Sequence, residues 1–488
     1  MKKIIFTLST AIFFVSTAFA QLGNIDPDFI PGTGFGPDQW TGKCEAIVQQ
    51  PDGKLLVGGQ FKTFDGDSAL YITRLNLDGS RDLSFSSPFE ENWGYNIRAI
   101  VLQNDGRIII GGTFNEVNGI SQNRIARLNS DGSLDLTFNP ASGFNQEVTA
   151  IELQPDGKIL AGGLFTVFDY VWGGSQTPVN GIARLNSDGS IDNTFNVGTG
   201  FSGGTGIGQR QIHKIVVQPD GKILVGGHYS SYNGNASILL TRLNSDGTID
   251  SSFDASANFS PAADGFYGQV YAMKLLPDGK IMIAGNYGNT NSAASGIDRL
   301  NSDGTLDVLF QTAPSNTDLR CFALDVQSDG KVVGASVNFG IPSEAFVVER
   351  YNTDGSLDTT FPQKYLNNDV TDLIIQNDGN ITFVGYFNYN PMGIMRLLGD
   401  GTSSVNLTEE STFDFSVYPN PTSEFVNINN IPQNSILRII NLTGKVMYEQ
   451  IVLDNFESVN VSGFTSGIYL IQIENNGRVA NKKLIIGR

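Results

Sequence analysis

Short apolar runs, many of them alternating with polar residues, recur along the chain between glycine-rich turns, and no convincing helical period of 3.6 residues is evident. The clearest example spans Val148 to Phe195. Apolar runs flank Asp156-Gly157 and again Asp188-Gly189. Because an Asp-Gly pair between two apolar runs is a strong hairpin signal, this unit is predicted to form four strands in two hairpins.

The unit occurs seven times, at intervals of 49 to 64 residues. Its first turn recurs at Asp52-Gly53, Asp105-Gly106, Asp156-Gly157, Asp220-Gly221, Asp278-Gly279, Asp329-Gly330 and Asp378-Gly379. Its second turn recurs at Asp78-Gly79, Asp131-Gly132, Asp188-Gly189, Asp246-Gly247, Asp303-Gly304, Asp354-Gly355 and Asp400-Gly401. A period of this length with four strands per unit is typical of a β-propeller blade. We therefore predict an all-β fold with a seven-bladed β-propeller over residues 21–407.

The seventh unit lacks the ending that the other six share. Those six end in Asp-x-x-Phe, whereas the seventh has Ser404 and Leu407 at these positions. The missing pair occurs near the start of the chain, as Asp26 and Phe29. We infer that this N-terminal segment supplies the outer strand of the seventh blade and closes the ring.

The loops of the predicted propeller fall on two faces. Both Asp-Gly turns of a unit lie on one, the turn face, so the loops between the second and third strands and between units lie on the other, the loop face. Variable segments lengthen the loop face, and they carry Trp40, Trp93, Trp172 and Tyr267. Exposed aromatic rings suit stacking on sugars or anchoring a protein, so these four are the candidate ligand-binding residues. Tryptophans that merely cap the ends of blades are the alternative.

An arginine precedes the second turn in all seven units, at Arg74, Arg127, Arg184, Arg242, Arg299, Arg350 and Arg396. In the second unit, Asn129, Asp131 and Asp135 resemble part of a calcium loop whose first ligand position is Arg127. A guanidinium there would repel a cation. We predict instead that Arg127 pairs with Asp135 or Asp131 as a structural bridge repeated around the ring, and we expect no metal or cofactor.

The two cysteines, Cys44 and Cys321, each lie nine residues before the glycine of a first turn, where the other units carry isoleucine or valine. We expect buried, unpaired thiols rather than a disulfide. The only histidines, His213 and His228, fall in one unit and lack the repeated partners of a triad or metal site. The position of His213 is Glu, Arg, Thr, Tyr or Phe in other units, which suggests tolerance.

No nucleophile elbow, metal-ligand cluster or phosphate loop is visible in the sequence. The carboxylates of Asp264, Asp318 and Asp369 lie in loop-face segments outside the repeat, and such groups build glycan-cleaving sites. A binding protein is the main prediction. The alternatives are an extracellular glycan hydrolase or lyase that uses these carboxylates, and a structural surface protein without its own ligand.

Residues 1–20 combine Lys2-Lys3, an apolar run and Ala18-Phe19-Ala20, as a secretory signal peptide does. Cleavage after Ala20 would leave 29 basic against 49 acidic residues, a net charge of −20. So acidic a surface disfavours nucleic acid, and no later apolar run is long enough to span a membrane. We expect a soluble, exported monomer.

The repeats resemble the delta-60 family of bacterial β-propellers, through Gln-Pro-Asp-Gly-Lys-Ile-Leu and Arg-Leu-Asn-Ser-Asp-Gly-Ser-x-Asp-x-x-Phe. The match covers roughly residues 22–407 and weakens at Val337–Val348 and at the end of the seventh unit. This resemblance implies a propeller and no shared reaction.

After a predicted linker at residues 408–412, the repeat is gone, and residues 413–488 show about seven short strands typical of a small β-sandwich. The segment resembles a type IX secretion (Por system) C-terminal sorting domain, with Tyr418-Pro419-Asn420-Pro421 at its start and Gly467-Ile468-Tyr469-Leu470 and Lys482-Lys483-Leu484 near its end. The resemblance implies export from a Gram-negative bacterium by Sec and then by the type IX secretion machinery. That machinery is therefore the expected partner of residues 413–488. The cargo is then released or held at the outer cell surface, where a polysaccharide or a surface protein is the expected ligand.

Deleting residues 21–29 should lower the melting temperature of the propeller markedly, because the seventh blade would lose its outer strand. Thermal unfolding followed by circular dichroism measures the effect. An unchanged melting temperature would contradict closure by this segment.

Overall fold

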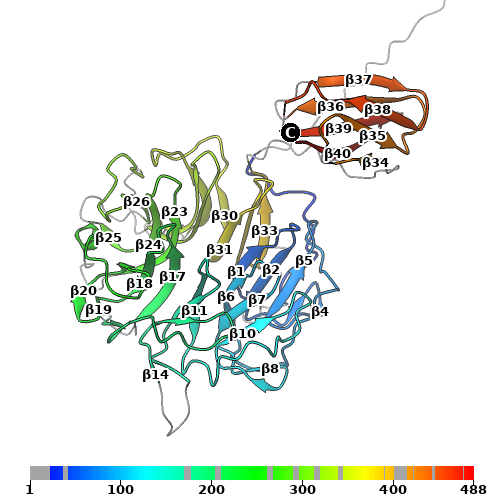
Figure 1. Cartoon of the computed structure of the whole chain (residues 1–488). Coiled ribbons are helices and arrows are strands. Elements are labelled where there is room, and N and C mark those ends of the chain that lie inside the picture. The colour runs from blue at the N-terminus through cyan, green and yellow to red at the C-terminus, as the bar shows by residue number, and fades with distance from the viewer. Residues whose placement is uncertain are drawn as a thin grey trace, which may run out of the picture. The chain divides into compact units, whose positions relative to one another are not determined.

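The computed structural model describes residues 22–36, 42–169, 177–203, 210–260, 268–289, 296–312, 319–338, 345–388, 391–399, 415–420, 422–441, 446–465, 467–475 and 478–487. The chain divides into two compact domains, an N-terminal domain (Met1–Gly401) and a C-terminal domain (Thr402–Arg488); the word unit is kept for one sequence repeat. Strands dominate both, and the only helix in these residues is a short 3-10 turn, η1 (Ser256–Asn258) (Figure 1). The all-β prediction is confirmed, and no described helix has the length and apolar character needed to cross a membrane.

The N-terminal domain contains seven main antiparallel sheets, one for each repeat, in which the strands follow chain order. Their first strands are β1 (Cys44–Gln49), β6 (Ile97–Leu102), β11 (Val148–Leu153), β17 (Gln211–Val217), β23 (Gln269–Leu275), β27 (Leu319–Val326) and β31 (Val370–Ile375). The second strands are β2 (Leu55–Gly59), β7 (Ile108–Gly112), β12 (Ile159–Gly163), β18 (Ile223–His228), β24 (Ile281–Asn286), β28 (Val332–Asn338) and β32 (Ile381–Gly385). The third strands are β5 (Ile72–Leu75), β10 (Ile125–Leu128), β15 (Ile182–Leu185), β21 (Leu240–Leu243), β26 (Ile297–Leu300), β29 (Ala345–Tyr351) and β33 (Ile394–Leu397), and the sixth sheet adds β30 (Lys364–Leu366).

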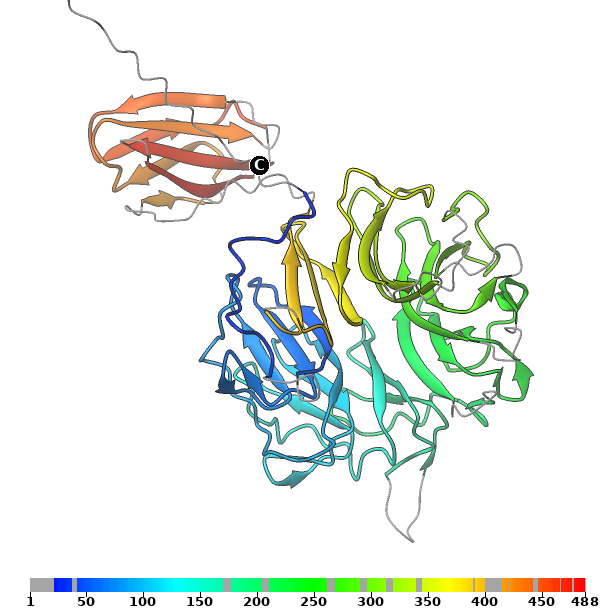
Figure 2. The same ribbon diagram turned by 180° about the vertical axis from the view of Figure 1, so that it is seen from behind.

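Each first strand contacts the first strand of the next sheet, and β31 contacts β1. The yellow strands of the last sheet accordingly lie beside the blue strands of the first in both views (Figures 1 and 2). Apolar clusters fill the space between neighbouring sheets. One of them joins Leu56 and Ile72 of the first sheet to Ile97 and Ile108 of the second. The alternating pattern of the strands is therefore used on two sides, as expected for sheets packed face to face.

In the first six sheets both Asp-Gly turns lie at one end; in the first sheet, for example, Leu55 in β2 pairs with Gln49 on one side and with Leu75 on the other. The turns differ in detail from two-residue hairpins. At the first turn of the third unit, the Gly157 amide donates to the Gln154 carbonyl at 2.9 Å, and only the glycine has a positive φ, +85°. This is a type I turn followed by a left-handed glycine, which lengthens each loop by one residue.

The fourth strand predicted for each unit is mostly absent. After the second turn, the chain forms one isolated bridge to the third strand, as between Leu134 and Leu128. Asp135 then ends the pairing, because its Oδ1 accepts hydrogen bonds from the Thr137 amide at 2.9 Å and the Thr137 hydroxyl at 2.7 Å. This side-chain cap turns the backbone away from the sheet edge.

The repeated arginine bridge is confirmed, with Asp135 rather than Asp131 as the partner. Arg127 Nε donates to Asp135 Oδ2 at 2.7 Å, and its guanidinium lies 5.0 Å from the Phe138 ring centre. Arg127 Nη1 also donates to the Ser187 carbonyl in the next unit, at 2.6 Å. The equivalent ion pairs are Arg74–Asp82, Arg184–Asp192, Arg242–Asp250, Arg299–Asp307 and Arg350–Asp358.

Near the chain start, Asp26 and Phe29 make the same contacts with β33. Arg396 Nε donates to Asp26 Oδ2 at 2.7 Å and its guanidinium lies 4.5 Å from the Phe29 ring centre. Ile25 bridges to Leu397, and Arg396 Nη1 donates to the Leu77 carbonyl of the first unit at 2.7 Å. Residues far apart in the sequence therefore reproduce the bridge that the other units form locally.

Short strand pairs occupy the loop face, and they come from the loops between second and third strands and from the segments between repeats. They are β3 (Thr63–Phe64) with β4 (Asp67–Ser68), β8 (Glu116–Val117) with β9 (Ile120–Ser121), β13 (Val167–Phe168) with β14 (Thr177–Pro178), β19 (Ser231–Tyr232) with β16 (Phe201–Ser202) and β20 (Asn235–Ala236), and β22 (Phe259–Ser260) with β25 (Gly288–Asn289). In the sixth unit, where the sequence pattern weakens, β28 and β29 are instead long paired strands.

Cys44 and Cys321 are buried free thiols in two different core clusters. The prediction of unpaired core cysteines is confirmed. Burial raises the pKa of both thiols, so they are protonated at neutral pH and behave as small apolar residues.

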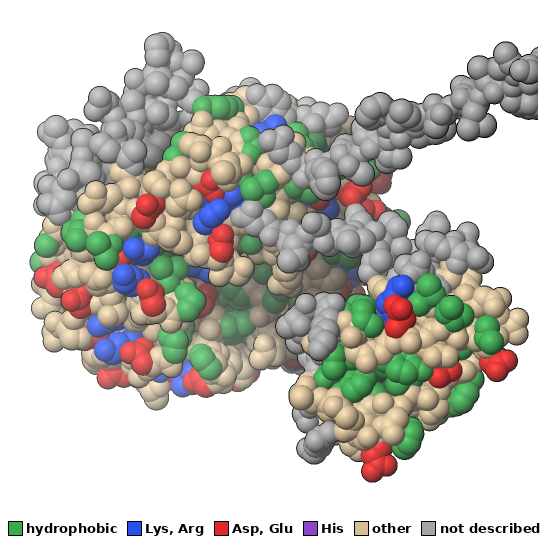
Figure 3. All heavy atoms as spheres, turned by 90° about the horizontal axis from the view of Figure 1, so that it is seen from above, with side chains coloured by type: hydrophobic (Ala, Val, Ile, Leu, Met, Phe, Trp, Pro, Cys, Tyr) green, Lys and Arg blue, Asp and Glu red, His purple; other side chains and the backbone are tan. Residues whose placement is uncertain are grey.

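The C-terminal domain contains two sheets. One has the order β34 (Ser416–Tyr418), β35 (Phe425–Asn429) and β38 (Phe456–Asn460); the other has the order β37 (Val446–Val452), β36 (Ser435–Asn441), β39 (Gly467–Asn475) and β40 (Arg478–Ile486). One cluster of buried residues, including Val426 and Leu437, draws on both sheets. Large hydrophobic side chains remain exposed on its surface, including Phe425, Ile451, Leu453 and Phe456. Figure 3 shows that hydrophobic side chains gather on one face of this domain.

Asp307→Asn should destabilise the N-terminal domain by about 2 kcal/mol at pH 7, because it leaves the partly buried Arg299 without its counter-charge. Burial opposes ionisation of Asp307, but the contacts with Lys280, the Leu309 amide and Arg299 outweigh it and lower the pKa of this carboxyl to about 2. The stability that the carboxylate provides is therefore complete above its unfolded pKa and is lost as the pH falls from about 4 towards 2.

Urea unfolding at pH 7, 4 and 2.5 measures the difference between the two proteins. That difference should shrink at the lowest pH. Asp303→Asn in the exposed second turn of the same repeat is the matched control and should change the stability far less. Equal losses for the two variants would contradict the role given to the bridge.

Candidate functional site

A β-bulge interrupts the first strand of each of the seven main sheets of the N-terminal domain, at the same place each time. The extra residue lies eight positions before the glycine of the first turn. The seven bulge residues are Glu45, Arg98, Thr149, His213, Tyr271, Phe322 and Thr371. Bulges commonly re-aim a side chain, and here they turn seven different side chains towards the centre of the ring of first strands.

The paired glycines of the second strand make room for this bulge. A Cβ on Gly163 would lie 2.1 Å from the carbonyl oxygen of Glu147, two residues before the bulge residue Thr149. The Gly162 Cβ position instead faces the Ile212 side chain of the next sheet, at 2.7 Å. Gly163 therefore permits a close backbone approach, and the approaching backbone belongs to its own sheet.

The first strands enclose a cavity of about 490 Å³. All seven bulge residues line it, and they also line a second cavity of about 280 Å³ together with Gln211, Asp369 and Tyr386. Asp369 and Tyr386 flank the ends of β31 and β32 on the loop face. We call this smaller cavity, with its seven bulge residues, the channel mouth.

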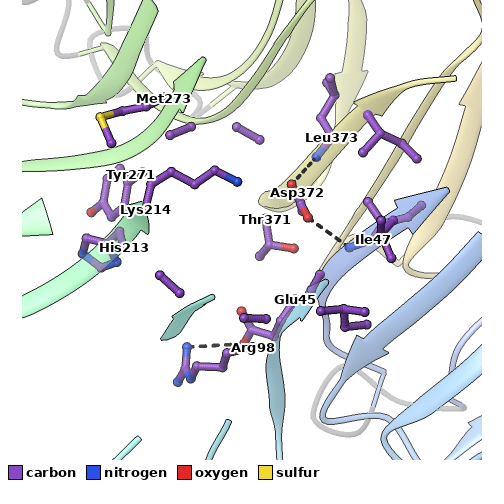
Figure 4. A pocket seen from close by; sticks show the side chains of 18 of the residues that line it. Glu45, Ile47, Arg98, His213, Lys214, Tyr271, Met273, Thr371, Asp372 and Leu373 are labelled. Carbon is purple, nitrogen blue, oxygen red and sulfur yellow. Dashed lines mark hydrogen bonds and ion pairs between the residues drawn. The ribbon is translucent and has the colours of Figure 1, made fainter. Parts of the chain in front are cut away.

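One side of the channel mouth is a polar arc from the seventh, first, second and third units. Glu45 Oε1 accepts hydrogen bonds from the Tyr386 hydroxyl and from Asn96 Nδ2, the latter at 3.1 Å. Arg98 Nη1 lies 3.8 Å from the same oxygen (Figure 4), while Arg98 Nε pairs with Glu147 at 2.7 Å. Burial would lower the pKa of Arg98, but Glu45 and Glu147 outweigh it and raise that pKa, so the arc is firmly charged.

The other side is an aromatic arc from the fourth, fifth and sixth units. The ring centres of His213 and Tyr271 are 5.1 Å apart, and Phe322 lies 5.1 Å beyond Tyr271. His213 Nε2 is 2.8 Å from Gln269 Oε1. Burial lowers the pKa of His213 to about 4, so the imidazole is neutral at pH 7 and shares the largely apolar character of its neighbours.

The layer below the mouth is formed by the residues that follow the bulges. Five of them are alanines, and the other two are Lys214 and Asp372. In Figure 4 the Lys214 side chain extends from β17 across the cavity towards Asp372 on β31. Asp372 accepts hydrogen bonds from the Ile47 amide at 3.0 Å and the Leu373 amide at 2.9 Å, so it joins the seventh sheet to the first.

Of the four aromatic residues proposed from sequence, the structure describes Trp93. Its side chain is 84% exposed on the loop face, so it does not cap the end of a blade. Lys62 Nζ lies 4.3 Å from its ring centre, and the neighbouring Asn92 amide donates to the Tyr71 hydroxyl at 2.8 Å. Trp93 is not among the residues that line the channel mouth. Trp40, Trp172 and Tyr267 lie outside the described residues, as do Asp264 and Asp318.

The seven bulge residues were not predicted as a site from the sequence. His213 and its equivalents looked like a tolerant strand position because they share no chemistry. The constant spacing of eight residues to the turn glycine was the available signal, since a position held in one register by seven repeats must point to a common place. Within the described residues, no group of three or more His, Cys, Asp or Glu side chains is arranged to hold a metal ion.

The sequence matches two family models. The model described as "Domain of unknown function (DUF5122) beta-propeller" matches residues 50–85, 103–138, 154–195, 218–253, 276–310 and 327–361. The secretion system C-terminal sorting domain matches residues 416–487. Both resemblances inferred from sequence motifs are confirmed, and six of the seven units are matched. No curated protein sequence matches the chain.

Several solved structures are similar at low identity. PorZ, described as a surface component of the type IX secretion system of Porphyromonas gingivalis, is 13% identical over 91% of this chain and 66% of its own, with a TM-score of 0.34. Drosophila Semaphorin 1b is 11% identical over 78% of this chain and 88% of its own, at 0.37. The polysaccharide lyase Uly1 is 10% identical over 91% and 99%, at 0.29. Identities and scores this low say nothing of function.

His213 should titrate with a midpoint near pH 4, well below the usual value near 6.5, because it must be charged inside a buried aromatic arc. The chain has two histidines, so carbon-edited NMR of the imidazole protons resolves them, and the His213→Gln variant assigns the signal. A midpoint above pH 6 would show that the ring is solvated and that the aromatic arc is open to water.

Proposed function

Because the chain carries DUF5122 beta-propeller repeats and a secretion system C-terminal sorting domain, we propose that it is an exported glycan-binding protein with its site at the channel mouth. The sorting domain indicates secretion through the type IX system to the cell surface or outside, and it implies an interaction with that system. Signal-peptide removal after Ala20 and a linker at residues 408–412 belong to the same proposal, in which the propeller spans residues 21–407.

We propose seven blades, with residues 22–29 as the closing strand. The contacts of β31 with β1 support a ring of seven first strands. The Arg396–Asp26 pair at 2.7 Å and the Ile25–Leu397 bridge support closure by the N-terminal segment. A ring closed by residues from both ends of the repeat region leaves no free sheet edge at the junction, which is the advantage of a propeller.

The observation that carries the ligand proposal is the division of the channel mouth into two arcs. A sugar ring has an apolar face of C–H groups and an edge of hydroxyl groups. The tilted rings of Tyr271 and Phe322 offer a surface for the apolar face. Opposite them, Glu45 and Arg98 offer a charged acceptor and donor that can bind hydroxyl groups. A protein ligand would not need both features within a mouth of about 280 Å³.

The mouth accepts the end of a chain rather than its middle, because it opens into a cavity surrounded by first strands. Trp93, with Lys62 over its ring, supports a second contact further out on the loop face, where the rest of a polysaccharide would run. We propose Trp40, Trp172 and Tyr267 as further contacts of this outer kind. Ligand binding without turnover separates this proposal from the hydrolase or lyase alternative.

Tyr271→Ala should weaken glycan binding about tenfold, because it removes the central ring of the aromatic arc at a cost of about 1–2 kcal/mol. Trp93→Ala should have a smaller effect that grows with oligosaccharide length. A glycan array followed by calorimetry on the full chain measures both. Leu136→Ala, on the outer edge of the second sheet and 70% exposed, is the control.

Binding unchanged in Tyr271→Ala would remove the channel mouth from the proposal. Release of unsaturated or reducing ends from a bound glycan would instead make the protein an enzyme, and Asp369→Asn would then be the first variant to compare.

A further inference from the structure

The outer face of the four-stranded sheet in the C-terminal domain carries aliphatic side chains. In β36, the strand between β37 and β39, Leu437 and Ile439 are buried in the core. Ile436, Arg438 and Ile440 alternate with them and therefore point away from the core. An antiparallel sheet with one solvated face normally carries polar residues on that face. Two of these three outward residues are isoleucines, so the sheet departs from the usual pattern.

Cross-strand neighbours extend this aliphatic surface over three strands. Ile436 pairs with Ile451 of β37, and Ile440 pairs with Val446 of β37 and with Leu470 of β39. Directly paired residues present their side chains on the same face of a sheet. Ile451 is 59% exposed, Val446 45% and Leu470 40%. We call these five residues the apolar sheet face.

The ion pair on this face is satisfied within the sheet. Arg438 Nε donates to Glu449 Oε2 at 2.6 Å, and Arg438 Nη1 donates to Gln472 Oε1 at 3.4 Å. Arg438 lies between Ile436 and Ile440 on β36, so the pair crosses the face between its two aliphatic ends. A partner of this surface therefore needs apolar groups of its own rather than an opposite charge, as the cores of protein interfaces do.

The opposite outer face, on the three-stranded sheet, has a different character although its hydrophobic side chains are equally exposed. There each exposed ring is paired with an asparagine: Tyr418 with Asn427, Phe425 with Asn460, and Phe456 with Asn429. On the apolar sheet face each exposed aliphatic side chain is paired with another aliphatic one. Singly exposed hydrophobic residues are common on proteins, whereas contiguous ones mark interaction surfaces.

We propose that the apolar sheet face is the surface by which the type IX secretion machinery binds this chain, through an apolar surface on one of its protein components. This inference rests on the proposed function, because it takes the sorting domain as the cause of export. All five residues lie within residues 416–487, the part of the chain that matches the sorting domain. The opposite face of the same domain serves another purpose or none.

The test follows export of the full chain from a Gram-negative host with a type IX system, by immunoblotting of the periplasm, the cell surface and the medium. Ile451→Gln combined with Leu470→Gln should lower the exported fraction about fivefold or more, with the protein retained in the periplasm, because the partner loses two central apolar contacts. Ile451→Val combined with Leu470→Val keeps the face apolar and should be exported nearly as well as the wild type.

Phe425→Gln combined with Phe456→Gln is the matched control, since it removes two equally exposed side chains from the opposite face of the domain. It should be exported like the wild type. The melting temperatures of the purified variants should stay close to that of the wild type, because all four replaced side chains are exposed. The export assay then measures recognition rather than folding.

The outcomes separate the two levels of the proposal. Normal export of the Ile451→Gln, Leu470→Gln variant, or an equal loss in the Phe425→Gln, Phe456→Gln variant, would overturn the assignment of the face. A wild type that is dimeric by sedimentation, with the Ile451→Gln, Leu470→Gln variant monomeric and normally exported, would assign the face to a second copy of the chain instead. Undiminished export of the wild type from a strain without the type IX machinery would overturn the proposed function itself.

Discussion

The N-terminal domain depends on the contacts of one arginine, which lies in the third strand of every repeat. Each guanidinium joins three parts of the chain at once: its own strand, the aspartate and phenylalanine of the outer segment, and a carbonyl of the next second turn. A short outer segment with one bridge could not hold its position by backbone pairing alone. A buried charge pair is a poor source of net stability compared with apolar contacts, but it is demanding in geometry. Repeated around the ring, it fixes how each sheet meets the next.

This arrangement frees the inner strand for another purpose. Contacts between sheets come mainly from the apolar clusters and from the arginine bridges at the outer edge, so the identity of the residue at the inner bulge can vary. It differs in nearly every unit, whereas the residues around it hardly change. A small residue opposite the bulge, such as Gly163, gives the backbone the space it needs. The scaffold thereby presents a ring of chosen side chains at one end of a narrow channel, with two charged residues, Lys214 and Asp372, in the alanine layer below.

In the proposed function, export and ligand recognition are carried by different parts of the chain. The C-terminal domain has its own core and leaves several large hydrophobic side chains exposed, which suits a segment that is handled by other proteins. The N-terminal domain places its acidic residues largely in turns and in bridges to arginine and lysine. Its net negative charge therefore describes the outer surface, while the channel holds nearly balanced charges. The net negative charge of the chain therefore does not determine the charge of a ligand that the channel would bind.

The sequence by itself determined the class of fold, the number and spacing of the units, the free cysteines and the arginine bridge. These follow from local patterns repeated in register, and a pattern repeated seven times corrects chance resemblances such as the calcium loop. The fourth strand predicted for each repeat is mostly absent. The hydrogen bonds from Thr137 to the Asp135 side chain compete with sheet pairing, and the composition of the segment does not reveal this competition. Only the tertiary structure decided the site. Seven residues of unlike chemistry, from Glu45 to Thr371, became one mouth because bulges in separate strands point to a common axis, and proximity across a ring leaves no trace in the order of residues along a chain.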